Sequence, residues 1–284
     1  MPGSIRLDEA LQSAAQQLRD LSDNPTMDAQ ILLSHALDHE RSWLLAHPEY
    51  QLSLIQQMTF ERLVERVRLG EALPYVVGRR WFYGRQFSIK PQVLIPRPET
   101  ELLVEAALEY LKKHPHRRRA VDVGTGSGCI AVTLCGEHPE LEMLAIDKSF
   151  TALQVAMLNK ERLTPNAGMS FLVADLLSGL KAEFDLICAN LPYIPSRRLA
   201  SLEVARREPL AALDGGLEGL DHIIGLVDNL DEYLAPGGRA ILEIDETQGA
   251  TVMRMVGEVL PGCGIVVRKD LAGLDRVIVI DRQG

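Results

Sequence analysis

The stretch of sequence that decides the fold reads Ala120-Val-Asp-Val-Gly-Thr-Gly-Ser-Gly128. A short β-strand pattern leads directly into a loop with three glycines, and an apolar helical pattern follows through about Glu137. Glycine lets the backbone turn tightly and approach a ligand closely. The helix that follows presents unpaired backbone N–H groups at its N-terminus. The stretch therefore predicts a ligand-binding loop between a strand and a helix.

Strand and helix patterns continue to alternate after this loop. Further strand patterns lie at residues 141–146, 169–173, 184–188, 239–244, 264–268 and 275–280, and helical patterns lie at about 151–163, 219–234 (ending at Pro236-Gly-Gly238) and 247–260. Such alternation predicts a mostly parallel sheet with helices on both faces. The short segment around Leu271-Ala-Gly-Leu274 cannot hold a parallel crossover, so the last two strands should form an antiparallel hairpin. We therefore predict an α/β fold with a Rossmann-like sheet of seven strands.

The N-terminal part of the chain shows helical patterns and no convincing strand. Apolar residues recur at helical spacing in residues 28–37 and 60–69. Asn24-Pro25 and His47-Pro48 interrupt these patterns, as expected between helices. We predict a small helical bundle over residues 1–72.

The segment between the bundle and the α/β region has a third pattern. Val76–Ile89 contains two β-prone runs separated by Gly84, which predicts a hairpin. Two prolines in Leu94-Ile-Pro-Arg-Pro-Glu-Thr-Glu101 fix an extended backbone before a helix that starts near Glu101. Residues 73–100 are therefore predicted to form a hairpin linker, and residues 101–284 the α/β domain.

Composition restricts the class of protein. The hydrophobic fraction of 46% and the charged fraction of 24% are ordinary for a soluble globular chain. No apolar run approaches the ~20 residues of a membrane span, and the N-terminus has no apolar signal region, so we expect a cytoplasmic protein with no membrane contact. The net charge of −9 lowers the expectation of direct nucleic-acid binding. The four cysteines form no C-x-x-C pair, so neither a metal site nor a structural disulfide is expected.

Acidic residues end the two strands that follow the glycine loop. Asp147 can accept both hydroxyls of a ribose, and Asp175 suits an adenine amino group, with Leu176 against the ring. Cys129 stands where a dinucleotide-binding loop requires glycine or alanine. The G-x-G-x-G spacing is instead typical of S-adenosylmethionine-dependent methyltransferases. The predicted cofactor is therefore S-adenosylmethionine, held by Gly124, Thr125, Gly126, Ser127, Gly128, Asp147, Asp175, Leu176 and Asn190.

The motif Asn190-Leu-Pro-Tyr193 follows the fourth strand and indicates the chemistry. A planar amide or exocyclic amine is a poor nucleophile because its lone pair is delocalised. The Asn190 side-chain oxygen and the Leu191 carbonyl can accept hydrogen bonds from its two N–H groups and orient the nitrogen. Pro192 fixes the backbone, and Tyr193 can cover the flat target group. These four residues are the predicted catalytic and substrate-binding residues, and positioning should supply most of the rate.

These residues resemble the HemK/PrmC family of protein-(glutamine N5) methyltransferases. The resemblance extends to Leu94–Glu101, Glu208-Pro-Leu-Ala-Ala-Leu-Asp-Gly-Gly216, Lys269–Arg276 and Asp28–Leu33, and so covers nearly the whole chain. It implies a class I methyltransferase fold and S-adenosylmethionine as cofactor, with Arg97, Glu99 and Thr100 contributing to its site. It implies that the substrate is the glutamine of the Gly-Gly-Gln loop of peptide chain release factors. It also implies that the helical domain docks the release factor, and we expect a monomer.

The sequence departs from this family's pattern at two positions. The family motif is Asn-Pro-Pro-Tyr, and Leu191 replaces its first proline. This change keeps the backbone carbonyl but adds an N–H group and frees φ. Asp245 stands where the family usually has glycine, so the family pattern does not predict the backbone conformation of that loop.

Three other functions remain open at this stage. Asn-Leu-Pro-Tyr is also the form of the motif in ribosomal RNA adenine dimethylases, so an RNA or DNA adenine methyltransferase is one alternative. Those proteins tend to be basic and carry their helical domain after the catalytic one, unlike this chain. A second alternative is glutamine methylation of a ribosomal protein. A third is an inactive binding module, which the intact Asn190 and Asp147 disfavour.

Overall fold

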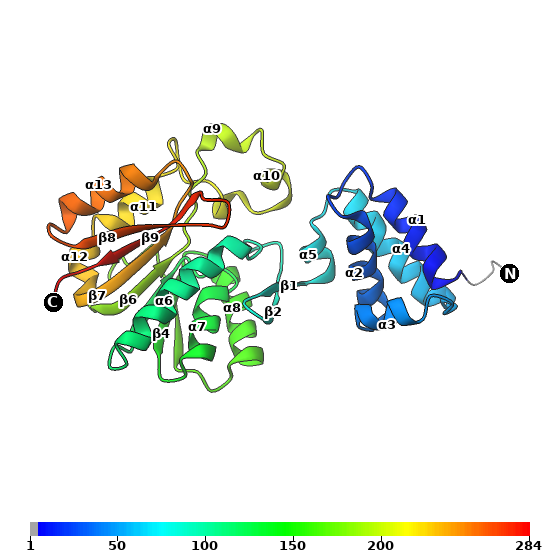
Figure 1. Cartoon of the computed structure of the whole chain (residues 1–284), viewed down its shortest axis with the longest axis horizontal. Coiled ribbons are helices and arrows are strands. Elements are labelled where there is room, and N and C mark those ends of the chain that lie inside the picture. Colours follow the sequence, from blue (N-terminus) through cyan, green and yellow to red (C-terminus); the bar gives the residue numbers. More distant parts are fainter. Residues whose placement is uncertain (1–4) are drawn as a thin grey trace. The chain divides into compact units, whose positions relative to one another are not determined.

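The computed structural model describes residues 5–284, so residues 1–4 of the predicted helical domain lie outside the described part. The chain divides into two compact units, Met1–Gly78 and Arg79–Gly284 (Figure 1). Among the described helices, none combines the length and apolar character that a membrane span requires.

The first unit is a small helical bundle, as predicted. It contains α1 (Leu7–Gln17), α2 (Pro25–Leu37), α3 (Arg41–Ala46), α4 (Leu54–Arg68) and α5 (Leu73–Val77). Asn24 starts α2 by accepting a hydrogen bond from the Met27 N–H at 3.1 Å, and Pro25 occupies the first turn. Leu32, Leu33 and other apolar side chains from all five of these helices form one buried cluster.

The second unit begins with a β-hairpin, β1 (Arg79–Phe82) and β2 (Arg85–Ser88). Tyr83 and Gly84 at its turn both have positive φ, which suits the tight turn of a two-residue hairpin. Val76 and Val77, which we expected in the first strand, belong instead to α5, because that helix continues until Gly78 ends it in a left-handed conformation.

The central sheet has seven strands in the order β5-β4-β3-β6-β7-β9-β8. The strands are β3 (Arg119–Val123), β4 (Glu142–Asp147), β5 (Met169–Val173), β6 (Phe184–Ala189), β7 (Leu234–Glu243), β8 (Gly264–Lys269) and β9 (Asp275–Asp281). Neighbours from β5 to β7 pair in parallel, and β9 pairs antiparallel with both β7 and β8. The predicted α/β fold and terminal hairpin are therefore confirmed.

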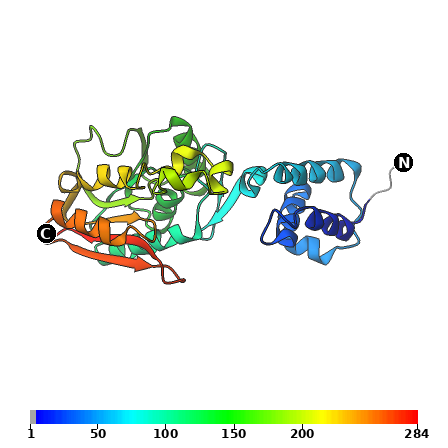
Figure 2. The same cartoon turned by 90° about the horizontal axis from the view of Figure 1, so that it is seen from above.

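Helices form two layers against this sheet (Figures 1 and 2). The principal ones are α6 (Glu101–Lys113), α7 (Cys129–Glu137), α8 (Phe150–Leu163), α11 (Asp221–Val227), α12 (Leu230–Tyr233) and α13 (Gly249–Val259). Contacts join α6 to α7 and α7 to α8, and separately join α11 to α13. Short helical turns complete the unit: η1 (Pro98–Thr100), α9 (Ser196–Leu199), α10 (Val204–Arg207) and η2 (Leu210–Ala212).

The region before β7 differs from the sequence prediction. We expected one helix over 219–234, ending at Pro236-Gly-Gly238, but the structure has the two helices α11 and α12, and these three residues lie within β7. Leu234 already pairs with Phe184, and the register shifts before the next pair, which lengthens the strand. Gly237 absorbs the irregularity with a positive φ.

The strand order fixes where a ligand can bind. The chain runs from β3 to β4 on one side and later places β6 on the other side of β3. In an open parallel sheet, the crevice forms at such a reversal, outside the carboxyl ends of the strands. The glycine loop after β3 and the tetrapeptide after β6 therefore lie beside each other.

Candidate active site

A pocket opens at this reversal and gathers the predicted site residues from five separate segments. Of those residues, Arg97, Thr100, Gly124, Thr125, Gly126, Ser127, Asp147, Asp175, Leu176, Asn190, Leu191 and Pro192 line it. Tyr193 lines an adjoining pocket that also shares Arg97 and Asn190. Gly128 is absent from both linings and serves as the N-cap of α7. Glu99 is also absent, because η1 turns Thr100 inward and leaves Glu99 exposed.

Two acidic side chains shape the glycine loop. The buried Asp122 accepts hydrogen bonds from the Thr125 hydroxyl at 2.6 Å and the Ala131 N–H at 3.2 Å, through the same carboxylate oxygen. Burial raises the pKa of Asp122 to about 7. Asp147 accepts from the Gly126 N–H at 2.9 Å. The loop is thus held by side chains near the ends of both β3 and β4.

Asp147 has the geometry expected of a ribose-binding acid. Its second carboxylate oxygen accepts from the Ser149 N–H at 2.8 Å, and Ser149 in turn caps α8 through the Ala152 N–H. Each carboxylate oxygen can accept a further hydrogen bond beyond the one it already has. The half-buried side chain therefore retains acceptor capacity on the pocket side.

Asp175 and Leu176 occupy the loop after β5. Leu176 has a φ of +51°, which is uncommon for a residue other than glycine. Its side chain packs against Gly225 of α11, where an added Cβ would lie 2.8 Å from it. Asp175 is exposed at the pocket wall. His222, three residues before Gly225, also lines the pocket and was not among the predicted site residues.

The tetrapeptide Asn190–Tyr193 follows β6 directly. The Asn190 side-chain N–H₂ donates to the Thr100 hydroxyl at 3.0 Å. Leu191 is buried, and its side chain lies 3.0 Å from where a Cβ on Gly124 would stand. In place of the family's proline, leucine therefore closes the space between the tetrapeptide and the glycine loop.

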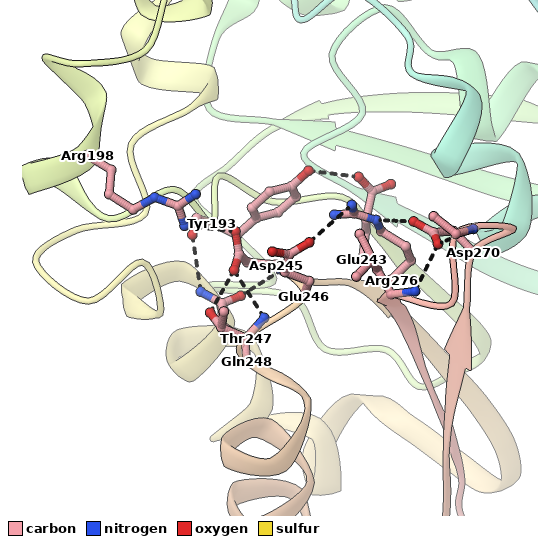
Figure 3. Close-up of polar contacts among 11 residues, drawn as sticks. Tyr193, Arg198, Glu243, Asp245, Glu246, Thr247, Gln248, Asp270 and Arg276 are labelled. Atoms are coloured by element: carbon pink, nitrogen blue, oxygen red, sulfur yellow. Dashed lines mark hydrogen bonds and ion pairs between the residues drawn. The ribbon is translucent and has the colours of Figure 1, made fainter.

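Glu243 is a site residue that the sequence analysis missed. It ends β7, and only 2% of its surface is exposed. Its two carboxylate oxygens accept from the Thr100 hydroxyl at 2.7 Å and the Tyr193 hydroxyl at 3.1 Å. Figure 3 shows the bond from Tyr193. Burial raises the pKa of Glu243 and is also the main cause of the raised pKa of Tyr193. The sequence signal was an acid inside the apolar run Ala240-Ile-Leu-Glu-Ile244.

The loop after Glu243 supports the tetrapeptide from behind (Figure 3). The buried Gln248 donates to the carbonyls of Tyr193 at 3.1 Å and Gly219 at 2.9 Å, and it accepts from the Asp245 N–H at 3.0 Å. Gln248 therefore ties three loops together through one side-chain amide.

Asp245, the second departure from the family pattern, has defined partners. Its carboxylate accepts from the N–H and hydroxyl of Thr247 at 3.1 and 2.7 Å, and from Arg198 at 3.2 Å. Burial opposes ionisation, but the bonds from Thr247 and Arg198 leave the pKa of Asp245 lowered. Aspartate is thus accommodated in this loop as a turn cap and an ion-pair partner.

Two of the segments that resemble the family interlock at the pocket rim. Arg97 forms an ion pair with Glu208, whose side chain is only 4% exposed. The other Glu208 oxygen accepts from the Ile95 N–H at 3.0 Å. Segment 94–101 is therefore fixed to segment 208–216 on one side and, through Thr100, to β7 on the other.

Comparison with known proteins matches both units. The family model described as the PrmC N-terminal domain matches residues 9–78, and the methyltransferase small domain matches residues 99–207. The release factor glutamine methyltransferase of Koribacter versatilis is 38% identical over 281 residues, covering 97% of this chain and 98% of that protein. That of Nitratidesulfovibrio vulgaris is 39% identical over 279 residues, covering 96% and 94%. The 16S rRNA N2 G1207 methyltransferase of T. thermophilus, solved with AdoMet and guanosine, shares the fold with a TM-score of 0.52 at 18% identity, covering 72% of this chain and 50% of that one.

Proposed function

The chain belongs to the family of release factor glutamine methyltransferases, and on that premise we propose a specific reaction for it. It transfers a methyl group from S-adenosylmethionine to the side-chain amide nitrogen, N5, of the glutamine in the Gly-Gly-Gln loop of a peptide chain release factor. Such a substrate belongs to the translation machinery, so we keep the expectation of a cytoplasmic protein as part of this proposal.

The residues that line the pocket support S-adenosylmethionine as the cofactor. The three loop glycines have positive φ and carry no side chain that would cover the loop backbone. Asp147 retains acceptors for ribose hydroxyls, and Asp175 with Leu176 suits the adenine. When bound, S-adenosylmethionine supplies an activated methyl group on a positively charged sulfur. The amide nitrogen would take over that positive charge as the N–CH₃ bond forms and would then lose one N–H proton to water, so no strong base is required before the transfer.

The tetrapeptide prepares the amide nitrogen for attack. Asn190 donates from its side-chain nitrogen to Thr100. Its side-chain oxygen is therefore available to accept from one N–H of the target amide. The Leu191 carbonyl accepts from the second N–H. Pro192 and the tethered ring of Tyr193 limit movement of the target group. Positioning of this kind contributes much of the rate of a reaction that lacks general-base catalysis.

The match of the N-terminal unit favours a release factor over the alternatives. The PrmC N-terminal domain model covers residues 9–78, and the curated relatives align over nearly the whole chain. An RNA adenine dimethylase would share only the methyltransferase unit and the tetrapeptide. We propose that this helical unit docks the release factor, as the family resemblance implies.

One experiment tests the reaction directly. Purified protein is incubated with S-adenosylmethionine and a release factor, and the Gly-Gly-Gln peptide is read by mass spectrometry. We expect the mass of one added methyl group on the glutamine, and none on a release factor whose glutamine is replaced by glutamate. An enzyme that binds cofactor, leaves the glutamine unmodified and methylates ribosomal RNA or a ribosomal protein instead would contradict the proposal.

A further inference from the structure

Four polar side chains form a continuous chain of hydrogen bonds beneath the tetrapeptide. Asn190 donates to Thr100 at 3.0 Å, Thr100 donates to Glu243 at 2.7 Å, and Tyr193 donates to the other oxygen of Glu243 at 3.1 Å. Thr100 is 1% exposed and Glu243 is 2% exposed. The four residues come from η1, β7 and the loop after β6, so only the folded chain brings them together.

The carboxylate at the root of this chain sets the direction of every bond in it. Both oxygens of Glu243 act as acceptors, one from the Thr100 hydroxyl and the other from the Tyr193 hydroxyl. Thr100 has a single hydroxyl proton and donates it to Glu243, so its oxygen can only accept from Asn190. The group of Asn190 that faces Thr100 must therefore be the N–H₂, and the amide oxygen must face away from it.

This direction matters because the two ends of an asparagine amide have nearly the same shape. With no partner to distinguish them, Asn190 could equally place its N–H₂ group at the target amide. Two N–H₂ groups facing each other offer donors with no acceptor, which is unfavourable in a dry site. Only the orientation with the Asn190 oxygen at the substrate orients the nucleophilic nitrogen.

We propose that Glu243 and Thr100 are positioning residues that fix the Asn190 amide with its oxygen toward the substrate nitrogen. This inference rests on the proposed function and adds two residues outside the tetrapeptide to its mechanism. It also accounts for an acid buried at the end of β7, since an unused buried carboxylate would only destabilise the fold. Tyr193 binds the same carboxylate, so one group orients both the acceptor and the covering ring.

The test compares two threonine-to-valine variants of the full chain. Valine keeps the shape of threonine and removes its hydroxyl. Thr133 in α7 is fully buried, and among the described residues its hydroxyl has no hydrogen-bond partner, so Thr133→Val is the matched control. We expect Thr100→Val to lower kcat for release-factor methylation about tenfold or more, roughly one lost oriented hydrogen bond, while the Kd for S-adenosylmethionine changes less than about twofold. Thr133→Val should leave both values within about twofold, and Thr100→Ser should recover most of the lost kcat.

A double-mutant cycle separates positioning through Asn190 from a general structural role. If Thr100 acts through Asn190, adding Thr100→Val to Asn190→Ala should cause almost no further loss in single-turnover rate. Additive losses would overturn the proposal, as would a rise in cofactor Kd that accounts for the whole effect of Thr100→Val. Glu243→Gln provides a second route should Thr100→Val fold poorly, because its amide can accept from only one of the two hydroxyls; an unchanged kcat in that variant would also overturn it. Wild-type protein that leaves the release factor unmethylated contradicts the proposed function, whereas equal rates for wild type and Thr100→Val contradict only the positioning role.

Discussion

The glycine-loop side of the pocket and its tetrapeptide side are held by contacts of different range. On the glycine-loop side, Asp122 binds the Thr125 hydroxyl three residues later, and Asp147 binds the Gly126 N–H 21 residues earlier. Both acids end strands that lie next to each other in the sheet. This side therefore forms as soon as one strand–loop–helix–strand unit has folded.

On the tetrapeptide side, the contacts span most of the second unit. Asn190 reaches Thr100 across 90 residues, and Thr100 reaches Glu243 across 143. Gln248 reaches the Tyr193 carbonyl across 55 residues. The difference suggests that cofactor binding and methyl transfer can be disturbed separately, since each side is fixed by its own partners.

Asn190→Ala is expected to have the largest effect, and it should slow methyl transfer far more than it weakens cofactor binding. Loss of the acceptor that orients the target nitrogen should lower kcat by more than about 100-fold, the scale of a lost transition-state-positioning group. The Kd for S-adenosylmethionine should change far less, because the glycine loop and Asp147 remain intact. Steady-state kinetics with calorimetric titration of the cofactor checks both values. Asn229→Ala, at an exposed asparagine whose side chain donates to the Gly225 carbonyl, is the control, and near-normal turnover of Asn190→Ala would remove Asn190 from the mechanism.

Gly124→Ala should have a smaller effect of the opposite kind, because it should weaken cofactor binding. Gly124 has a φ of +73°, and an added Cβ would lie 3.0 Å from the Leu191 side chain. We expect the cofactor Kd to rise about tenfold, from ~1 kcal/mol of left-handed strain together with the displaced side chain. Gly179→Ala is the matched control, since φ there is +79° and nothing lies within 4 Å of the new Cβ. The same titration on both variants decides: Gly179→Ala should bind cofactor nearly as the wild type does, and an equally unchanged Kd for Gly124→Ala would contradict the role given to the glycine loop.

The different sequence separations of the contacts on the two sides also explain which site residues could be predicted from the sequence. The glycine loop, Asp147 and the order of the first strands are local patterns, and periodicity with turn chemistry predicts them. Glu243 could not be predicted, because an acid in an apolar strand has no local partner in the sequence, and its partners Thr100 and Tyr193 become neighbours only in the folded sheet.

Errors in the predicted elements have a similar origin. Pro236-Gly-Gly238 is a local break signal, yet pairing between Leu234 and Phe184 places these residues in a strand. Val76 and Val77 have a high β propensity, yet they are helical because they pack into the core of the first unit. Glu99 shares its segment with Thr100, but the single turn of η1 sends it to solvent. Tertiary contacts decided the first two cases over the local pattern, and the local turn of η1 decided the third.

The smallest expected effect concerns Asp245, which lies on the tetrapeptide side but touches no part of the pocket lining. Asp245→Asn weakens the acceptors for Thr247 and Arg198 and should lower the free energy of unfolding by about 1–2 kcal/mol at pH 7, with kcat within about twofold of wild type. The folded pKa of Asp245 is lowered, so its ionised form contributes stability above the unfolded value near 3.8, and this contribution is lost as the pH falls through the lower folded value.

Denaturant unfolding at pH 7, 5 and below 4 checks this prediction. The difference between wild type and Asp245→Asn should hold from pH 7 to 5 and shrink below about 3.8, because the aspartate of the unfolded chain then takes up a proton before that of the folded chain does. Asp275→Asn removes an ion pair with the exposed Lys269 elsewhere in the same unit. It should lower the free energy of unfolding by less than Asp245→Asn does, because surface ion pairs contribute little. A kcat that falls with stability for Asp245→Asn would mean that the Asp245 loop, with Gln248, also positions Tyr193. The long-range contacts that matter for chemistry would then extend beyond Glu243 and Thr100 to this loop.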